Sequence, residues 1–321
     1  MNSHLLPFPY NQSQPPTRLD RIFQPILNAF LGGSHKRVPQ KPSTVRAEIA
    51  LLGDGSPIRI ICISDTHNLT PPLPPGDILI HAGDLTPHTH KIVIAGNHDI
   101  ILDETLDGKL FSHQQNGNFG DRSDSSEQRG SLDWGHIHYL KNEAVTLQLL
   151  VPGLGAQQVR QVKIFGSPLT PEFGSWAFQY PAIRDVWTEH IPDDTQIVVV
   201  HCPPALYGDC DGEVGHDGKI KVKGDGYLLR EIRRVRPKFG VCGHIHGAFG
   251  TSLIEHHGTQ EARDRLRLQW SAYSILNVLN RSLWKKFTGK GVQETLVVNA
   301  AVAPGNSETQ AKSPVVIGFN V

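Results

Sequence analysis

"IAGNHD", residues Ile94–Asp99, ends an apolar run with a glycine and then places an amide, an imidazole and a carboxylate side by side. Polar groups at the end of a buried strand are costly to bury unless a partner satisfies them. Amides, imidazoles and carboxylates are all metal ligands in proteins. The stretch therefore raises the question of whether the rest of the chain supplies further ligands.

Apolar runs of the same kind recur along the chain. They cover Ile58–Ser64, Asp77–Ala82, Lys91–Gly96, Gln161–Ser167, Gln196–His201 and Lys238–His244. Near-continuous Val and Ile runs are typical of strands that are buried on both faces. Gly226–Val235 has helical spacing and precedes the last of these runs. The pattern predicts an α/β fold.

Metal-capable side chains follow five of these strands. They are Asp65 and His67, then Asp84, then Asn97 with His98 and Asp99, then His201, and finally His244 and His246. Ligands bind at the carboxyl ends of strands in open α/β sheets, so we expect these side chains to meet at one edge. The glycines beside them allow sharp turns and a close approach of the backbone to an ion.

Seven of these side chains form a candidate ligand set: Asp65, His67, Asp84, Asn97, His201, His244 and His246. Oxygen and imidazole donors suit Mn, Fe, Zn or Mg. Seven donors exceed the needs of one tetrahedral ion, but they suit two ions about 3.5–4 Å apart that share a carboxylate and act on a phosphoryl group. DxH or GD alone is a weak signal. The ordered series DxH, GD, GNHD, H and GHxH, each at a strand end, is a strong one.

This ordered series resembles the calcineurin-like metallophosphoesterase superfamily over roughly residues 58–250. The segments Gly166–Pro181, Leu228–Gly250 and Val297–Ala301 resemble its MPPED-type phosphodiesterases, in the version common in fungi. The resemblance implies a sandwich of two mixed β-sheets flanked by helices, within a domain spanning residues 45–303. Around that domain we expect a disordered linker over residues 1–44 with a short helix near 19–31, and a loose tail over 304–321 that offers at most an edge strand.

The resemblance also implies roles for the candidate ligands. One divalent ion would be held by Asp65, His67 and His246, a second by Asn97, His201 and His244, and Asp84 would bridge the two. His98 would lie over the phosphate, stabilise developing charge and protonate the leaving oxygen. Asp99 would orient His98, as carboxylates commonly orient imidazoles around metals. The identity of the two ions stays open among Mn, Fe, Zn and Mg.

The implied activity is hydrolysis of small phosphodiesters, with cyclic nucleotides among the candidates, through attack by hydroxide that the metals generate. The second choice is a catalytically impaired protein that binds metal or nucleotide, or an incomplete gene product. The third choice is a phosphoprotein phosphatase, because that branch would show GDxVDRG and GNHE where this chain has GDLT (Gly83–Thr86) and GNHD. Trp176, Phe178 and Tyr180 indicate either a base-stacking pocket or a loop anchor.

Composition limits the partners. Lys plus Arg and Asp plus Glu both number 31, which gives no electrostatic argument for nucleic acid. No apolar run reaches the length of about 18 residues that a membrane span requires. The four cysteines form no CxxC pair, and no secretory signal precedes them, so we expect an intracellular, cytoplasmic protein. The expected partner is a small phosphate ester such as a nucleotide, and the oligomeric state stays open.

The connection between the second and third strands departs from the resemblance. Both strands present ligands at the same end and should be parallel, and a parallel crossover normally takes a dozen or more residues. Residues 85–90 reach at most about 20 Å when fully extended. The five-residue strand that they must retrace is about 17 Å long. The connection can therefore barely be made, and it leaves no residues for a helix. Related proteins have an amphipathic helix here. We interpret the gap as a segment missing from a gene model or splice form; the alternative is a divergent member whose 19–31 helix covers the exposed face.

Inserting a family-like helix between Thr86 and Pro87 should raise the melting temperature, because the helix would cover an apolar sheet face. Circular dichroism melts of the two chains make the comparison. Equally cooperative melting of both chains at the same temperature would show that no segment is missing.

Overall fold

The structure is a computed structural model of the chain. It describes residues 46–47, 58–67, 69, 71–82, 91–106, 134, 137–151, 158–209, 221–258, 260–261, 264, 293–304 and 311–319. The expected linker and helix over residues 1–44 and the connection over residues 83–90 lie outside these ranges. None of the described helices is long and apolar enough to cross a membrane.

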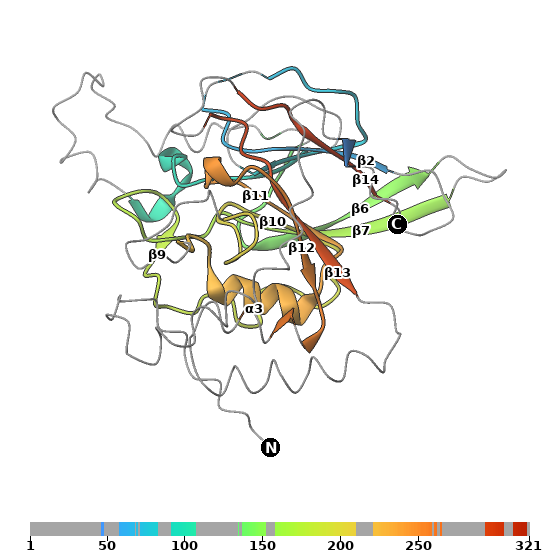
Figure 1. The fold of residues 1–321 in the computed structure, drawn as a ribbon. Coiled ribbons are helices and arrows are strands. Elements are labelled where there is room, and N and C mark those ends of the chain that lie inside the picture. The colour runs from blue at the N-terminus through green and yellow to red at the C-terminus, as the bar shows by residue number, and fades with distance from the viewer. Residues whose placement is uncertain are drawn as a thin grey trace.

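Six of the described strands form the first sheet, in the order β1–β14–β2–β3–β4–β5. Figure 1 labels β14 and β2, which are neighbours in this sheet. Their bounds are Arg46–Ala47 for β1, Val315–Phe319 for β14, Ile58–Ile63 for β2, Ile78–Ala82 for β3, Lys91–Ile94 for β4 and Ile137–Tyr139 for β5. Strands β2 to β5 are mutually parallel, and β14 is antiparallel to β2. The expected terminal strand therefore exists, but it lies inside the sheet rather than at its edge, because β1 pairs with its outer side.

The second sheet has the order β12–β13–β11–β10–β7–β6. Its strands are Gly250–Glu255 (β12), Glu294–Asn299 (β13), Phe239–Cys242 (β11), Ile197–Val200 (β10), Gln158–Ser167 (β7) and Glu143–Val151 (β6). The four central strands are parallel, and β12 and β6 run antiparallel at the two edges. Both sheets are thus mixed, which confirms the predicted fold class.

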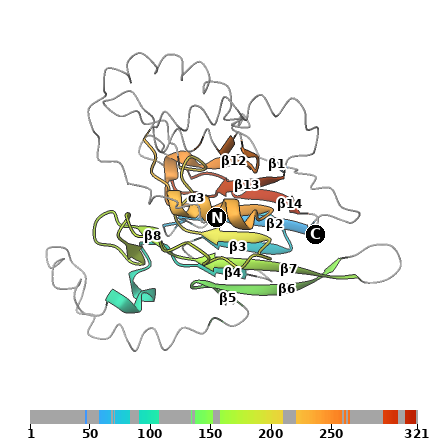
Figure 2. The ribbon, with the colours of Figure 1, turned by 90° about the horizontal axis from the view of Figure 1, so that it is seen from below.

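Smaller elements complete the described fold. Strands β8 (Thr170–Pro171) and β9 (Gln179–Tyr180) pair with each other, and short 3₁₀ turns cover η1 (Ile100–Leu102), η2 (Glu104–Leu106) and η3 (His246–Ala248). Helix α3 (Gly226–Val235) lies against the second sheet (Figure 2). Its apolar residues, including Leu228 and Ile232, pack on Val198 and Val200 of β10.

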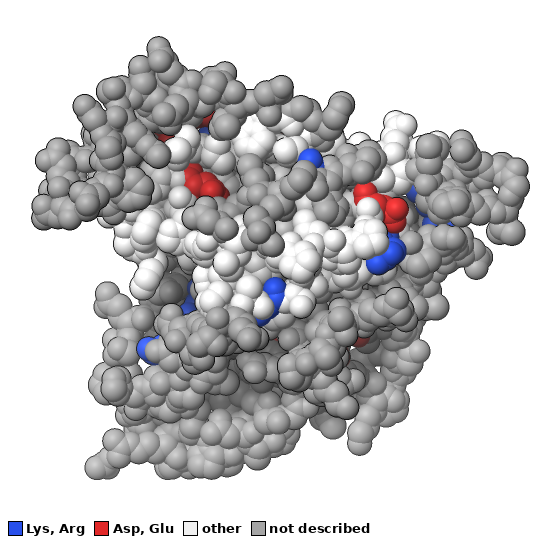
Figure 3. Space-filling model, turned by 90° about the horizontal axis from the view of Figure 1, so that it is seen from above, with Lys and Arg blue, Asp and Glu red and all other residues white. Residues whose placement is uncertain are grey.

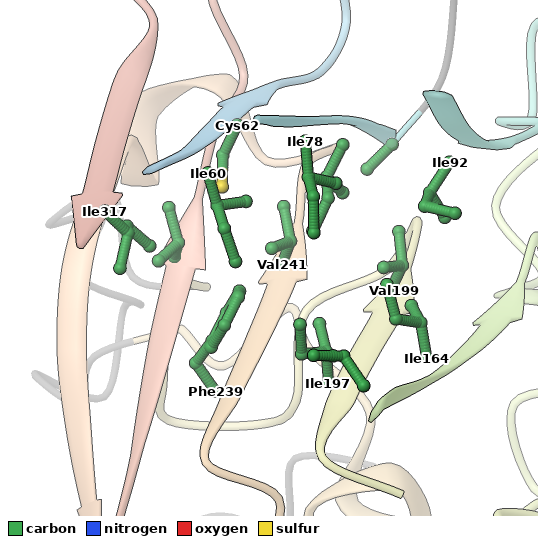
Figure 4. Close-up of a cluster of buried hydrophobic side chains, with 14 of the residues drawn as sticks. Ile60, Cys62, Ile78, Ile92, Ile164, Ile197, Val199, Phe239, Val241 and Ile317 are labelled. Carbon is green, nitrogen blue, oxygen red and sulfur yellow. The ribbon is translucent and has the colours of Figure 1, made fainter. Parts of the chain in front are cut away.

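The main core lies between the two sheets (Figure 4). Ile60, Ile78 and Ile92 come from the first sheet, and they face residues such as Val199 and Val241 of the second. Alternate residues of β2 and β3, such as Ile61 and Leu79, form a separate cluster with Val302. Because these strands are covered on both faces, their sequences are continuously apolar rather than alternating.

The two sheets are joined at the end where the polar motifs lie. Ser64, directly after β2, forms a parallel bridge with Ala301, which follows β13. The Ser64 N–H donates to the Ala300 carbonyl at 2.8 Å, and the Val302 N–H donates to the Ser64 carbonyl at 2.9 Å. This junction brings the strand ends of one sheet next to those of the other.

The parallel pairing of β3 with β4 confirms the expected direction of these strands. Leu79 lies opposite Lys91 and Ala82 opposite Ile94, so the connection returns along three residues only, or about 10 Å. The distance of about 17 Å for retracing all five residues of β3 was therefore too long. Residues 85–90 reach at most about 20 Å, which is enough for this return without a helix. The missing helix itself stays a prediction.

On the face shown in Figure 3, the described Lys, Arg, Asp and Glu side chains form a few separate spots of both signs. In the sequence as a whole, 31 basic residues balance 31 acidic ones.

Candidate metal centre

Six of the seven predicted ligands lie at the junction of the two sheets. They follow four strands: Asp65 and His67 come after β2, Asn97 after β4, His201 after β10, and His244 and His246 after β11. The seventh, Asp84, lies outside the described residues. The arrangement arises because parallel strands from two sheets end at the same edge.

Asp65, His67 and His246 form the first group. The Asp65 Oδ1 atom lies 3.4 Å from His246 Nε2, which in turn lies 3.4 Å from His67 Nε2. One potential ligand atom from each residue falls within 4.8 Å of the other two. A buried carboxylate and two half-exposed imidazoles that converge in this way are a donor set that a divalent ion can use.

Asn97, His201 and His244 form the second group. The Asn97 Oδ1 atom lies 2.7 Å from His201 Nε2 and 3.1 Å from His244 Nδ1. His201 Nδ1 lies 3.2 Å from the Ala82 carbonyl oxygen, which can only accept, so we assign the proton of the neutral ring to Nδ1. The lone pair of Nε2 then faces the lone pairs of the Asn97 oxygen. A cation resolves this contact between two acceptors, so the residues present fit a metal ion.

Asp65 connects the two groups. Its Oδ2 atom accepts the backbone N–H of His244 at 2.8 Å and lies 2.5 Å from the Ser64 hydroxyl. The Ser64 hydroxyl also lies 2.5 Å from the Ala82 carbonyl, the same oxygen that His201 contacts. The carboxylate thus fixes the start of the His244 loop while its other oxygen faces His246.

The backbone is strained at three of the candidate ligands. Asp65, His67 and His244 have φ angles of 51°, 42° and 65°, in the left-handed region. Such conformations cost of order 1–3 kcal/mol each and cluster at functional sites.

The electrostatics favour the metal-binding protonation states of Asp65 and His244, whereas in the metal-free chain they favour the protonated form of His246. Burial alone would raise the pKa of Asp65, but the hydrogen bonds from His246 and from the Ser64 hydroxyl hold that pKa well below its usual range. Burial lowers the pKa of His244 to about 3. The hydrogen bond to Asp65 raises the pKa of His246. At neutral pH Asp65 is therefore ionised and His244 is neutral, as metal ligands must be.

Two glycines make room for these contacts. A Cβ atom on Gly96 would lie 2.6 Å from a ring carbon of His201, and one on Gly243 would overlap the Ser64 Oγ and Asp65 Oδ2 atoms. The glycines that the sequence places beside the motifs therefore serve close approach between a backbone and a side chain.

His98 is exposed beside the first group, with its ring 5.0 Å from that of His67 at an angle of 76°. Its neighbour Asp99 accepts the Gly96 N–H through Oδ2 at 2.6 Å, which closes the GNHD turn. The orientation of His98 by Asp99 stays a prediction. The exposure of His98 leaves its ring accessible to a substrate.

The aromatic residues of the loop between β8 and β9 have different roles. Phe178 and Tyr180 are buried, and the Tyr180 hydroxyl hydrogen-bonds Asp225, the residue that caps α3. These two anchor the loop. Trp176 is partly exposed and lies against His98, with 4.4 Å between ring centroids. The Ala177 N–H donates to the Asn97 carbonyl at 3.0 Å, which ties the loop to the site.

Sequence reasoning missed Ser64 and Asn299. The buried Asn299 amide Nδ2 lies 2.8 Å from the Gly208 carbonyl oxygen, 3.0 Å from that of Ile245 and 3.4 Å from that of Gly243. It therefore holds the loop that carries His244. An amide at the end of the apolar run of β13 was the available signal, because an isolated buried amide needs several partners.

No family model matches the chain. The Probable rhamnogalacturonate lyase C of Emericella nidulans is 34% identical over 282 residues, which cover 81% of this chain and 24% of that protein. The human Metallophosphoesterase domain-containing protein 1 is 34% identical over 220 residues, which cover 60% of this chain and 61% of that protein. The UPF0046 protein K07C11.7 of Caenorhabditis elegans is 30% identical over 226 residues, which cover 61% of this chain and 67% of that protein.

A sandwich of two mixed sheets with carboxylate, amide and imidazole side chains gathered at one edge defines the class of the metallophosphoesterases. Within that class, the chain belongs to the family of the UPF0046 proteins and metallophosphoesterase domain-containing protein 1. It spans less than two thirds of the lyase and human relatives, so the activity of a complete relative is a separate question. Among solved structures, TT1561 of Thermus thermophilus is 10% identical, with a TM-score of 0.29 over 62% of this chain and 85% of that chain.

The substitution Gly243→Ala should abolish high-affinity metal binding, because the new Cβ would displace Asp65 and Ser64. Gly240→Ala is the matched control, since its Cβ would meet only the Val198 carbonyl oxygen, at 3.7 Å, in ordinary contact. Isothermal titration with Mn²⁺ measures both variants. Unchanged affinity in Gly243→Ala would contradict the assigned site.

Proposed function

We propose that this protein is a divalent-metal-dependent hydrolase of phosphate esters. The observation that carries the proposal is the convergence of two donor groups at one sheet edge, with the exposed imidazole of His98 beside them. The chain's membership of the metallophosphoesterase family supports the same reaction class.

The proposed centre takes two divalent ions. Asp65, His67 and His246 would hold the first, and Asn97, His201 and His244 the second. When bound, such ions supply positive charge that binds the phosphate and promotes deprotonation of water. Asp84 would bridge the two ions, as the family resemblance implies. It follows Ala82 by two residues, and the Ala82 carbonyl lies 3.2 Å from His201 Nδ1 and 2.5 Å from the Ser64 hydroxyl, which in turn contacts Asp65.

The side chains around the ions carry the remaining steps. His98 is exposed and lies next to His67, so its ring can donate a proton to the leaving oxygen. Asp99 closes the turn that presents His98. Asp65 needs no further rearrangement to bind a cation, since the His244 N–H and Ser64 hydroxyl already fix its Oδ2 atom.

We propose small phosphodiesters as the substrates, including nucleotides. Trp176 supports this assignment, because it places a partly exposed indole beside His98, where the organic group of an ester would lie. The name of the lyase relative gives no substrate for this chain, because the match covers 24% of that protein. A protein that binds metal or nucleotide without turnover is the rival. The six described ligands and His98 favour the enzyme, since none of them is substituted.

The purified chain should hydrolyse a generic aryl phosphodiester in the presence of Mn²⁺ and lose the activity when EDTA removes the metal. Asp84→Ala should lower kcat/KM by more than about 100-fold, since losing a residue that only supports a metal ligand already costs roughly 10–100-fold. Asp194→Ala, an exposed carboxylate paired with Lys163, is the matched control and should be unaffected. Folded wild-type protein that binds Mn²⁺ without turnover would favour the binding protein.

Trp176→Ala should lower kcat/KM for an aryl ester by about tenfold relative to a methyl ester of the same phosphate, because aromatic stacking contributes about 0.5–1.5 kcal/mol beyond burial of area. Phe173→Ala, which removes an 81% exposed ring from the same loop, is the control and should leave the ratio unchanged. An equal loss for both esters in Trp176→Ala would show that Trp176 only supports His98.

A further inference from the structure

Lys312 links the C-terminal part of the chain to the candidate metal centre. Its Nζ atom donates to the His246 carbonyl at 2.7 Å and lies 3.3 Å from the Ala303 carbonyl. The same ammonium lies 5.3 Å from the centroid of the Phe249 ring. Its backbone N–H donates to the Val302 carbonyl at 2.7 Å. Both ends of this residue are therefore fixed, although 65 residues separate it in sequence from His246.

The two carbonyls that Lys312 contacts belong to segments that position ligands. One carbonyl is that of His246 itself. The other is that of Ala303, whose N–H donates to the Asp65 carbonyl at 3.2 Å. The Lys312 ammonium thus links the backbone of His246 to Ala303, which is itself hydrogen-bonded to Asp65.

The same segment also contacts the His246 ring, which hydrogen-bonds the Pro304 backbone. When a backbone carbonyl accepts a hydrogen bond from one nitrogen of an imidazole, it fixes the orientation of the ring and leaves the other nitrogen for a metal. Here the other nitrogen is Nε2, which faces Asp65 and His67. Pro304 therefore holds the ring of His246, and Lys312 holds its main chain.

We propose that Lys312 is a positioning residue for the metal group of Asp65, His67 and His246. Lys312 sets the distance between the His246 loop and the Asp65 turn. That distance determines how well Asp65, His67 and His246 together bind their ion. This inference rests on the proposed function, because it requires the group to bind a divalent ion.

The physical basis is that the His246 loop has limited support of its own. The loop is a single 3₁₀ turn, and Asn299 holds the Gly243 and Ile245 carbonyls on its other side. A hydrogen bond from a charged donor is roughly twice as strong as a neutral one, and the aromatic face of Phe249 adds a cation–π contact. Without the ammonium, the His246 carbonyl loses its lysine donor, and the ring nitrogen moves relative to Asp65.

The second metal group should depend on Lys312 much less. Asn97 and His201 are fixed by the Ala177 N–H and the Ala82 carbonyl, neither of which contacts Ala303, Pro304 or Lys312 through a described hydrogen bond. His244 shares the loop of His246, but Asn299 holds the carbonyls on either side of it and Asp65 accepts its N–H, so its position has support besides Lys312. The effect of removing Lys312 should therefore fall mainly on one of two ions. A residue that merely stabilises the fold would affect both ions together.

The test is Co²⁺ titration of the full chain, read by calorimetry and by the visible absorption of bound Co²⁺. The variants are Lys312→Met, which keeps the stem but removes the donors, and Lys312→Gln, which shortens the side chain and removes its charge. Lys312→Arg restores a charged donor. Lys163→Met is the matched control, because Lys163 is also partly exposed and hydrogen-bonded, to Asp194 at the opposite end of the sheet.

We expect Lys312→Met and Lys312→Gln to weaken one Co²⁺ site about tenfold, within the 10–100-fold range typical of residues that orient metal ligands, and to change its absorption. Lys312→Arg should recover most of the affinity, and Lys163→Met should match the wild type. Should Lys312→Met not fold, Lys312→Gln provides the same comparison.

Wild-type affinity at both sites in Lys312→Met or Lys312→Gln would overturn the proposal. So would an equal loss at both sites, a loss in Lys163→Met of the same size, or a failure of Lys312→Arg to recover affinity. A wild-type chain that binds no Co²⁺ would overturn the proposed function as well, whereas wild-type binding with unaffected variants would overturn this inference alone.

Discussion

The buried carboxylate of Asp65 is the constraint on which the rest of the site depends. An ionised group out of water is stable only when charged or hydrogen-bonded partners surround it. Asp65 obtains them from both sheets: the Ser64 hydroxyl on its own strand, the His244 N–H at the end of β11, and the His246 ring. Gly243 lacks a side chain because the carboxylate occupies the space where a Cβ would lie.

This requirement explains why the two sheets are joined where they are. The Ser64–Ala301 bridge continues β2 of one sheet beside the end of β13 of the other, so the turn carrying Asp65 lies next to the loop carrying His244. The core between the sheets holds this junction in place through Ile60, Ile78 and Val241. Packing of apolar side chains therefore sets the geometry of polar ones, and the fold maintains the strained φ angles of Asp65, His67 and His244.

Much of this organisation could be predicted from the sequence. Continuous Val and Ile runs located β2, β3, β4, β7, β10 and β11, and the polar residues after them located the candidate ligands, because both signals are local. The interior position of β14 could not be predicted, since a short apolar run carries no information on which strands pair with it. Asn299 and Lys312 were missed for a related reason. Their partners are backbone carbonyls, which any sequence offers, and only the folded chain brings those carbonyls within reach. The distance assumed for the β3–β4 connection was too long because the pairing register is a tertiary property.

We propose that two groups of side chains at the junction, each with members from both sheets, hold two divalent ions. The most direct measurement is anomalous X-ray diffraction from crystals grown with Mn²⁺. The account predicts two anomalous peaks, one among Asp65, His67 and His246 and one among Asn97, His201 and His244. A single peak, or peaks at other residues, would contradict it.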